Sequence, residues 1–388
     1  MPGRLQGDRV RAYHQIRILS RRHRITLITF AGPRELGSGA GDLEASGARV
    51  VTVPLSRIRV AAALVRGGLS RLPLQVALYE HRPMQRAIRE ALRQDTYDLA
   101  HVQLARMGPY LSELGSLPRV VDLVDALSLN MHWRVPFDSG PWRWVTRLEA
   151  RRLERYERAI CDSVDQALVG SPVDREALGS PSKLAVLTNG VDLASFPYER
   201  SGREPERVIL SGNMGYFPNI QAALWLDRAI LPLVALAVPD VRLDIVGARP
   251  DRRVRRLARH DPRITLAHDV GDVAPHLRRA TVAVAPMQTG SGQQFKVLEA
   301  MASGTPVVAT TLAASGLETR HGEHLLIADT PEAFAAQVVR VLSDRTLAET
   351  LAASARRLVE DRYTWERSAA ALESIYRGIA ARRDATSA

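Results

Sequence analysis

Short apolar runs recur along the whole chain and alternate with longer stretches of helical periodicity. In the first half, the runs cover residues 25–30, 48–53, 98–102, 119–124, 164–170 and 184–188. In the second half, they cover residues 207–212, 241–247, 263–267, 281–286, 305–310 and 324–328. Apolar runs between helices are typical of parallel strands that are buried on both faces and joined by right-handed crossovers. The pattern predicts an α/β protein with two doubly wound, Rossmann-like sheets.

A polar stretch with Pro and Gly at residues 196–205 separates the two sets of runs. With roughly 150 residues per domain, a chain of this length has two domains. We therefore expect an N-terminal domain over 1–195 and a C-terminal domain over 206–365. The last stretch, 366–388, continues an amphipathic helix that we expect to pack back on the first domain. Ligands of such folds bind at the carboxyl ends of the strands, here in a cleft between the domains.

The chain opens with a glycine turn at Gly7 and a helical stretch over 9–20. A Rossmann-like domain begins with a strand before that turn, and this strand is absent from the sequence pattern. We expect the reading frame upstream of Met1 to encode it, since an unpaired sheet edge is hazardous. The alternative is a domain that tolerates the loss.

Charge and cysteine usage narrow the function classes. The net charge is +11, and residues 1–200 hold 29 Lys and Arg against 21 Asp and Glu. This excess attracts anionic partners, although no motif of a nucleic-acid-binding fold accompanies it. Cys161 is the single cysteine, so no internal disulfide can form, and the Cys/His spacings of metal sites are absent. Without an apolar leader or an 18-residue apolar span, we expect a cytoplasmic protein.

One stretch carries clear chemistry. The run ending at Ala285 is followed by TGSGQQ and then by good helix formers from Phe295. Glycines in a turn between a strand and a helix let backbone N–H groups approach a phosphate at the helix N-terminus. Lys296 places a cation in the first helical turn, where the helix dipole disfavours it unless an anion is bound. We therefore predict a diphosphate site here.

Glu299 lies one turn further along the same helix. A carboxylate can accept hydrogen bonds from both hydroxyls of a ribose. The alternative is a solvated helix residue, but Leu298 and the small apolar segment AMASG flank Glu299. The diphosphate and ribose sites together predict a nucleotide ligand.

These residues bring the sequence to a known family. KVLEAMASGTPVVAT (296–310) strongly resembles the donor-binding element of retaining GT-B glycosyltransferases of family four. LTNGVD (187–192) resembles a segment ahead of their interdomain linker, and SGNMGYFPNIQAALWL (211–226) resembles the first loop and helix of their C-terminal domain. The residues at 7–30 look like their first loop, helix and second strand. The closest resemblance is to bacterial sugar transferases linked to exopolysaccharide and exosortase loci.

The resemblance implies the GT-B architecture and sugar transfer from a nucleotide-diphosphate donor, UDP- or GDP-linked, without a metal cofactor. It implies an acceptor that is a glycan, a lipid-linked saccharide or a small molecule, and retention of configuration. Carried over by position, the donor-binding residues are Gly212, Asn213, Gly247, Arg249, Gly290, Ser291, Gly292, Gln293, Gln294, Lys296, Val297, Leu298 and Glu299.

Two departures bear on the donor. The wider family has a glutamate that holds the donor sugar eight positions before the ribose-binding one, where this chain has Ser291. The family also clamps the diphosphate with an Arg and a Lys around 211–221, where this chain has no cation. Lys296 and Arg249 are the nearest replacements. A nucleotide-sugar epimerase on the same fold, or a binding partner with a degenerate site, are the alternative functions.

Residues of the N-terminal domain are candidates for the acceptor side. Gly7, Asp8 and Arg9 form the expected loop, and His101 and Asp125 follow apolar runs, so we place them at strand carboxyl ends. Asp125 and His101 can hydrogen-bond a hydroxyl or assist proton transfer as catalytic groups. The alternatives are helix capping for Asp125 and a core histidine for His101.

Residues 55–79 are basic and apolar without an acidic residue until Glu80. Helices of this composition lie on anionic membranes. We therefore expect peripheral association with the inner face of the cell membrane. The alternative is a loop over the acceptor, because Gly67, Gly68 and Pro73 interrupt the helix.

Overall fold

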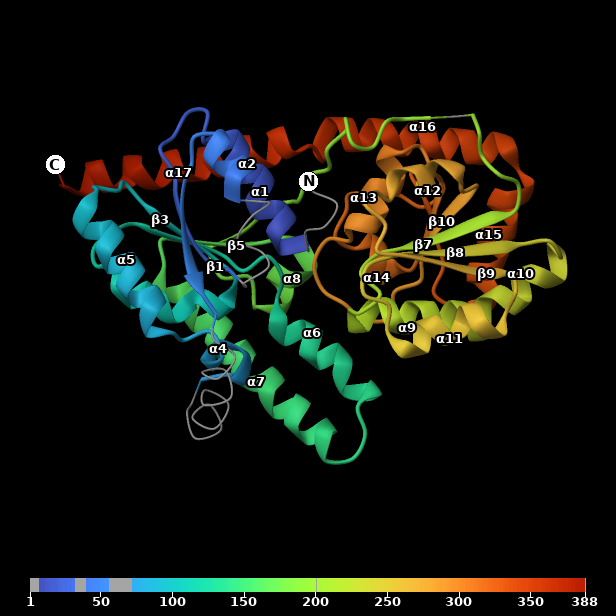
Figure 1. The fold of residues 1–388 in the computed structure, drawn as a ribbon, viewed down its shortest axis with the longest axis horizontal. Helices are drawn as coiled ribbons and strands as arrows, with labels where there is room; N and C mark the ends of the chain where they lie inside the picture. Colours follow the sequence, from blue (N-terminus) through green and yellow to red (C-terminus); the bar gives the residue numbers. More distant parts are fainter. Residues whose placement is uncertain (1–6, 32–39, 56–71, 200, 388) are drawn as a thin grey trace. The chain divides into compact units, whose positions relative to one another are not determined.

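A computed structural model describes residues 7–199 and 201–387, apart from the segments 32–39 and 56–71. The chain forms two compact units (Figure 1). The N-terminal unit contains Asp8–Thr188 together with Ser368–Ala388, and the C-terminal unit contains Asn189–Arg367. The last helix therefore belongs mostly to the N-terminal unit.

The N-terminal unit holds two parallel sheets. One pairs β1 (Thr26–Ala31) with β2 (Arg49–Pro54). The other has the order β3-β4-β5-β6. Its strands are β3 (Ala100–Gln103), β4 (Arg119–Asp122), β5 (Gln166–Val169) and β6 (Leu184–Val186). All six correspond to apolar runs of the sequence, so this part of the prediction is confirmed.

Helices cover both faces of the four-stranded sheet. The helices of this unit are α1 (Gly7–Leu19), α2 (Ala40–Ala45), α4 (Leu74–Ala77), α5 (Arg82–Gln94), η2 (Ala105–Leu114), α6 (Leu127–Arg134), η3 (Val135–Phe137), α7 (Pro141–Ser163), α8 (Pro172–Ala177) and α17 (Trp365–Ser387). On one face, Leu19 of α1 and Leu372 of α17 pack against Val120 and Leu168. On the other, Ile160 of α7 packs with strand residues such as Val121.

The C-terminal unit is built on one parallel sheet of order β12-β11-β10-β7-β8-β9. Its strands are β7 (Arg207–Ser211), β8 (Arg242–Gly247), β9 (Ile264–His268), β10 (Val282–Ala285), β11 (Val307–Ala309) and β12 (Leu326–Ile327). They too match the six predicted runs. Buried residues such as Val208 and Ile245 are β-branched, as a sheet covered on both faces requires.

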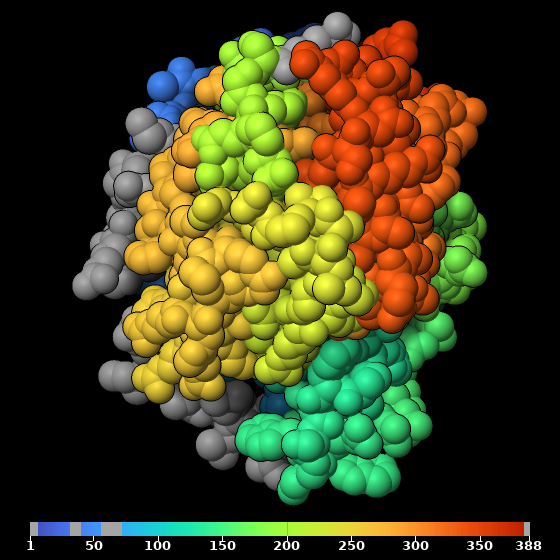
Figure 2. Space-filling model, turned by 90° about the vertical axis from the view of Figure 1, so that its right-hand side faces the viewer, coloured from blue at the N-terminus to red at the C-terminus, as the bar shows by residue number. Residues whose placement is uncertain are grey.

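Two helical layers enclose this sheet. The helices are α9 (Phe217–Trp225), η4 (Leu226–Ile230), α10 (Leu231–Ala237), α11 (Arg252–His260), α12 (Ala274–Arg279), α13 (Phe295–Ala302), α14 (Thr311–Ala314), α15 (Pro331–Ser343) and α16 (Arg345–Arg362). One core cluster joins α9, α10, α11 and α15 to the sheet, and a second joins α12, α13, α14 and α16. Figure 2 shows one side of this unit, with α10 among its yellow residues.

The segment Phe217–Ala237 is long and apolar enough to cross a membrane by length and composition. Its residues Ile220, Leu226 and Ile230 are buried in the first core cluster. Because the helix fills the core of the C-terminal unit, its apolar composition is explained by packing against the sheet.

Candidate functional site

The order of the C-terminal sheet creates a switch point. From β7 the chain adds β8 and β9 on one side, and β10, β11 and β12 on the other. The loops that leave β7 and β10 at their carboxyl ends therefore diverge to opposite faces of the sheet, and ligands of doubly wound sheets bind at such a point. The loop after β7 begins with Gly212 and Asn213, and the loop after β10 contains the glycine-rich stretch.

Glycine is required where these loops approach one another. Gly247, at the end of β8, has φ of 152°, and a Cβ there would overlap the carbonyl oxygen of Gly212. Gly290 has φ of 116°, and its Cβ would lie 3.2 Å from Cβ of Pro218. Both backbones take conformations that residues with a side chain rarely adopt. The close approach keeps the three loops at one edge of the sheet.

Helix α13 begins at this edge of the sheet, after β10. Its N-cap residue, Gln294, forms no side-chain hydrogen bond to the first turn. Gln293 next to it is buried, and its Oε1 accepts from the backbone N–H of Asn189 at 2.6 Å, both within the C-terminal unit. The Gln293 Nε2 is buried without a hydrogen-bond partner among the described residues. A helix N-terminus without a side-chain cap, beside a buried donor, suits an anionic ligand.

Lys296 lies in the first turn of α13. Its Nζ donates to Oε1 of Gln294 at 2.8 Å and lies 3.6 Å from Sδ of Met287. Its stem passes Gly212, where a Cβ would lie 3.4 Å from Lys296 Cε. Burial lowers the pKa of the Lys296 ammonium to about 8, although Glu299 partly opposes this shift. The lysine therefore holds a destabilised charge that a bound diphosphate would stabilise.

Glu299 lies one turn beyond Lys296. Burial raises the pKa of its carboxyl to about 7, Lys296 lowers it, and Asp272 raises it further. No ion pair within 4 Å links Glu299 to a cation in the described part of the chain. The burial that raises its pKa argues against the alternative of a solvated helix residue, and no ion pair within the described residues occupies the carboxylate.

The other predicted donor residues have different surroundings. Arg249 is exposed in the loop after β8, with φ of 52°, and its carbonyl lies close to Gly215. Asn213 Oδ1 accepts from the N–H of Gly215 at 3.0 Å, which fixes the loop after β7. Ser291 is buried, 8% exposed. Val297 and Leu298 are 1% and 0% exposed in the second core cluster. Their side chains support α13 from behind, so only their backbone can contribute to a donor site.

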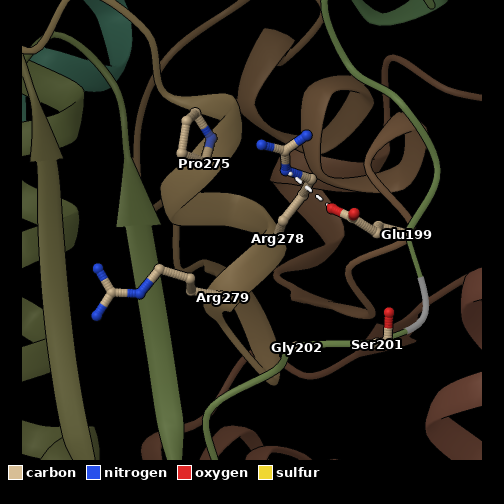
Figure 3. Close-up of a pocket in the computed structure, with 6 residues that line it drawn as sticks. All are labelled: Glu199, Ser201, Gly202, Pro275, Arg278 and Arg279. Carbon is tan, nitrogen blue, oxygen red and sulfur yellow. Dashed lines mark ion pairs between the residues drawn. The ribbon is translucent and has the colours of Figure 1, made fainter.

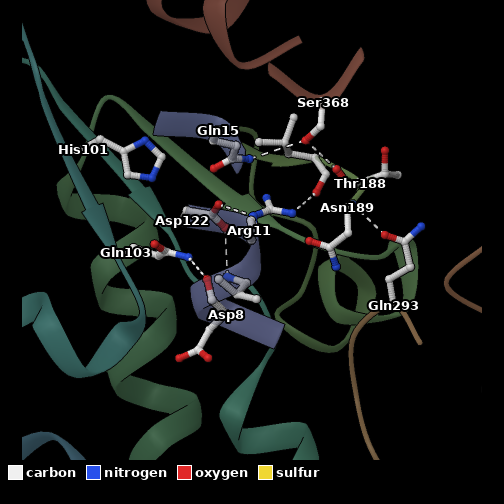
Figure 4. A network of polar contacts seen from close by, with 12 residues as sticks. Asp8, Arg11, Gln15, His101, Gln103, Asp122, Thr188, Asn189, Gln293 and Ser368 are labelled. Atoms are coloured by element: carbon white, nitrogen blue, oxygen red, sulfur yellow. Dashed lines mark hydrogen bonds and ion pairs between the residues drawn. The ribbon is translucent and has the colours of Figure 1, made fainter. Parts of the chain in front are cut away.

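The N-terminal unit contains a buried ion pair that the sequence pattern did not predict. Nε of Arg11 in α1 donates to Oδ2 of Asp122 at 2.6 Å, and its Nη1 donates to the carbonyl of Leu187 at 2.8 Å (Figure 4). Asp122 Oδ1 accepts from the N–H of Val124 at 2.9 Å. Val124 has φ of 65°, which is a genuine outlier for a β-branched residue. An aspartate within an apolar run, VVDLV, is the signal that could have found this site.

Asp125 follows this turn directly after β4. Burial raises the pKa of its carboxyl well above the usual value, and Asp174 and Asp8 raise it further, whereas Arg11 lowers it. The alternative that Asp125 caps the next helix is wrong. The first N–H groups of α6 are instead bound by Asp174, at 3.0 Å from Ala126 N, and by Glu157, at 2.7 Å from Leu127 N.

His101 does not lie at a strand end as predicted. It is the second residue of β3, and its Nδ1 is 2.6 Å from the hydroxyl of Tyr376 in α17, with the two rings edge to face. Burial lowers the pKa of His101, an effect that Asp122 opposes. The partner on α17 favours the alternative of a core histidine.

The predicted acceptor loop is not a loop. Gly7, Asp8 and Arg9 form the first turn of α1. Nε2 of Gln103 donates to the carbonyl of Asp8 at 2.8 Å (Figure 4). The basic segment 55–79 falls largely outside the described residues, since 56–71 are not described.

A cavity of about 300 Å³ in the C-terminal unit is lined by Glu199, Ser201, Gly202, Pro275, Arg278 and Arg279 (Figure 3). The ion pair between Arg278 and Glu199, at 3.1 Å, crosses it. Arg279 ends α12, shortly before β10 begins at Val282, so the cavity lies near the amino ends of the strands, away from the glycine loops. Among the described residues, no cluster of three or more His, Cys, Asp or Glu side chains is arranged to hold a metal ion.

The sheet of the C-terminal unit lies within a stretch that matches a known protein family. Residues 205–344 match the family model Glycosyl transferases group 1, and this range contains every predicted donor-binding residue. This part of the chain is a group 1 glycosyltransferase domain. The predicted family is thereby confirmed over these residues.

The group 1 glycosyltransferase domain has relatives in bacteria. The phosphatidyl-myo-inositol mannosyltransferase of Mycobacterium tuberculosis is 34% identical over 222 residues, 53% of this chain and 56% of that protein. The D-inositol 3-phosphate glycosyltransferase of Rhodococcus jostii is 27% identical over 51% of this chain and 48% of its own length. The chain spans about half the length of the curated relatives it matches.

Solved structures extend the likeness over nearly the whole chain. The sucrose-phosphate synthase of Thermosynechococcus elongatus matches with a TM-score of 0.68 at 18% identity, over 92% of this chain and 100% of that one. The Anabaena protein HepE, solved in complex with UDP and glucose, matches with a TM-score of 0.70 at 14% identity, over 97% of each chain. These likenesses confirm the predicted GT-B fold over nearly the whole chain.

Proposed function

We propose that this group 1 glycosyltransferase transfers a sugar from a UDP- or GDP-linked donor to a glycan, a lipid-linked saccharide or a small molecule, with retention of configuration. One observation carries the proposal. The loops after β7 and β10, together with Lys296 and Glu299, meet at the switch point of the sheet within the residues that match the family. Nucleotides bind at such points in doubly wound folds.

The donor diphosphate would bind at the N-terminus of α13. The backbone N–H groups of Gly290–Gln294 and the helix dipole supply donors and partial positive charge. Lys296 supplies a full charge, and a neighbouring diphosphate would raise its pKa from about 8 and keep it protonated. Its role in the reaction is to stabilise the charge that develops on the departing diphosphate.

The ribose hydroxyls would bind Glu299. Its carboxyl carries a pKa of about 7 in the free protein, and two hydroxyl donors would favour its ionised form. We propose that transfer needs no metal ion, because Lys296 and the N-terminus of α13 supply positive charge to the diphosphate.

The acceptor side is proposed from the relatives and from Asp125. The names of two relatives contain phosphatidyl-myo-inositol and D-inositol 3-phosphate, which supports a lipid-linked or small hydroxylated acceptor here. Asp125, with its raised pKa and its place after β4, would hydrogen-bond an acceptor hydroxyl. With a lipid-linked acceptor, we propose that the enzyme acts in the cytoplasm at the inner face of the membrane. An uncharacterized protein in the cps region of Klebsiella pneumoniae, 25% identical over 175 residues, supports a link to exopolysaccharide synthesis.

One observation favours a second candidate, a nucleotide-sugar-binding partner without turnover. Ser291 is buried in the loop where the resembling family carries a glutamate for the donor sugar. A hydroxyl binds a sugar more weakly than a carboxylate does. This candidate predicts nucleotide binding with no transfer to any acceptor.

The test is a thermal-shift screen of the full chain against UDP- and GDP-sugars, followed by turnover assays with the best donor. We expect a stabilising donor, whose sugar is then transferred to an acceptor. Binding without transfer to glycan, lipid-linked or inositol acceptors supports the partner instead. Conversion of the donor without any acceptor would indicate an epimerase, and no nucleotide binding at all would refute the proposed donor site.

A further inference from the structure

Helices α6 and α7 form an antiparallel hairpin that extends from the N-terminal unit (Figure 1). The connection between them is well held. Asp138 accepts from Oγ1 of Thr146 at 2.5 Å and pairs with Nε of Arg134 at 3.3 Å. Glu157 binds the first N–H groups of α6, which fixes the base of the hairpin. The tip therefore presents a fixed surface.

This tip is unusually apolar for an exposed surface. Trp142 is 71% exposed, Trp144 is 70% exposed and Leu148 is 52% exposed. Phe137 and Val145 are exposed beside them. These five are most of the seven large apolar side chains that are exposed among the described residues. Exposed apolar side chains that gather at one place mark an interaction site, whereas scattered ones do not.

The face of α7 that continues from the tip toward the base of the hairpin is basic. Trp144, Leu148, Arg151 and Arg155 recur at the i, i+4, i+7 and i+11 spacing of one helix face, and the Arg147 guanidinium lies 5.5 Å from the centre of the Trp144 ring.

The carboxylates of α7 lie elsewhere. Glu149 and Glu157 are buried, and Glu154 pairs with Arg158 at 2.9 Å. In the described part of the chain, no carboxylate lies within ion-pair distance of Arg147, Arg151 or Arg155. The face thus offers cations and apolar groups together, without acidic groups.

We propose that the tip of the α6–α7 hairpin docks into the headgroup region of an anionic phospholipid bilayer. Tryptophan favours the interface between headgroups and acyl chains, and arginines near that depth bind lipid phosphates. Two exposed tryptophans that project from a tip can enter a bilayer surface. In a protein–protein interface, by contrast, the residues that contribute most binding energy lie in a well-packed, desolvated patch. The outer surface of the hairpin is visible in teal to green at the lower edge of Figure 2. No residue of the donor site takes part, so this proposal stands or fails independently of sugar transfer.

The experiment is flotation of the full chain with vesicles of equal parts phosphatidylglycerol and phosphatidylcholine, and with vesicles of phosphatidylcholine alone. We expect binding to the anionic vesicles, weakened by salt, and a blue shift of tryptophan emission on binding. The variant Trp142→Ala/Trp144→Ala should bind at least about tenfold more weakly. The variant Arg147→Gln/Arg151→Gln/Arg155→Gln should lose the salt-sensitive part of the binding.

Matched controls lie in the C-terminal unit. Leu236 is 82% exposed on α10, and Leu236→Ala removes an equally exposed apolar side chain. Arg345 is also exposed, and Arg345→Gln removes one surface charge. Both controls should bind vesicles as the parent does. The proposal is overturned if the parent chain does not bind anionic vesicles, or if the tryptophan variant binds as tightly as the parent. A dimer in sedimentation that the tryptophan variant loses, without vesicle binding, would assign the tip to a second copy of the chain.

Discussion

Arg11 and Asp122 form a fully buried ion pair, with Nε of the guanidinium 2.6 Å from Oδ2 of the carboxylate. The pair joins the first helix to the second strand of the four-stranded sheet. Through its other oxygen, Asp122 holds the N–H of Val124 in a turn that an isolated valine would avoid. Asp125 follows that turn, so the ion pair positions the residue that we propose to meet the acceptor.

Removal of one partner of this pair should be costly. Arg11→Met leaves a buried carboxylate without its counter-ion, and we expect a loss of about 3–5 kcal/mol in the free energy of unfolding. Denaturant unfolding measures the loss. Arg21→Met, at an exposed position of the same unit, is the control and should change stability little. The double variant Arg11→Met/Asp122→Asn should regain part of the loss, and a single variant as stable as the parent contradicts the role of the pair.

Glu299→Ala should weaken donor binding by roughly 10- to 100-fold, since a hydrogen bond to a charged group contributes about 1.5–3 kcal/mol. Glu299→Gln should be milder, because one acceptor oxygen remains. Isothermal titration with the best donor measures both, with circular dichroism to check the fold. Glu332→Ala, an exposed glutamate on α15, is the matched control. If Glu299→Ala binds the donor as tightly as the parent does, Glu299 does not bind the ribose.

Lys296→Met should lower the single-turnover rate more than the donor affinity, because its charge acts on the departing diphosphate. The same variant should raise Tm of the free protein. The pKa of Lys296 is about 8, below its unfolded value, so the charged lysine destabilises the fold fully at pH values below about 8. Thermal unfolding at neutral pH tests this point. A variant that is both slower and less stable would assign Lys296 a structural role instead.

Ser291→Ala should leave the affinity for free UDP or GDP nearly unchanged. The hydroxyl stands where the resembling family contacts the sugar, so any effect should fall on discrimination between donor sugars. Competition between two nucleotide sugars measures the sugar preference, and titration with free UDP or GDP measures the nucleotide affinity for comparison. A large loss of affinity for the free nucleotide would place Ser291 at the diphosphate.

Donor affinity should have a maximum between pH 7 and 8. Below a pH of about 7 Glu299 becomes protonated in the free protein and loses its capacity to accept two hydroxyl donors. Above a pH of about 8 Lys296 loses its charge. Titrations across this range should show the affinity fall on both sides of the maximum. The Glu299→Gln variant should lose only the fall at acidic pH. A donor affinity of the parent that does not change with pH would show that the charges of Glu299 and Lys296 do not contribute to donor binding.

The sequence alone determined the elements and the glycine-rich site. Strands, helices and the turn before α13 depend on the period of apolar residues and on glycines a few positions apart, and these signals are local. All twelve predicted strands are present within a residue or two of their expected limits, and the residues of the donor loops meet at one sheet edge because parallel strands share their carboxyl ends.

Only the tertiary structure decided which polar groups meet across long distances in the chain. Asp174 and Glu157 bind the start of α6, where Asp125 was the local candidate. Tyr376 reaches His101 across 275 positions. The exposure of Trp142 and Trp144 was equally hidden, because a helical period shows which residues share a face but not whether another element covers it. Burial and partner choice depend on packing between distant segments, and a local pattern carries no information on that packing.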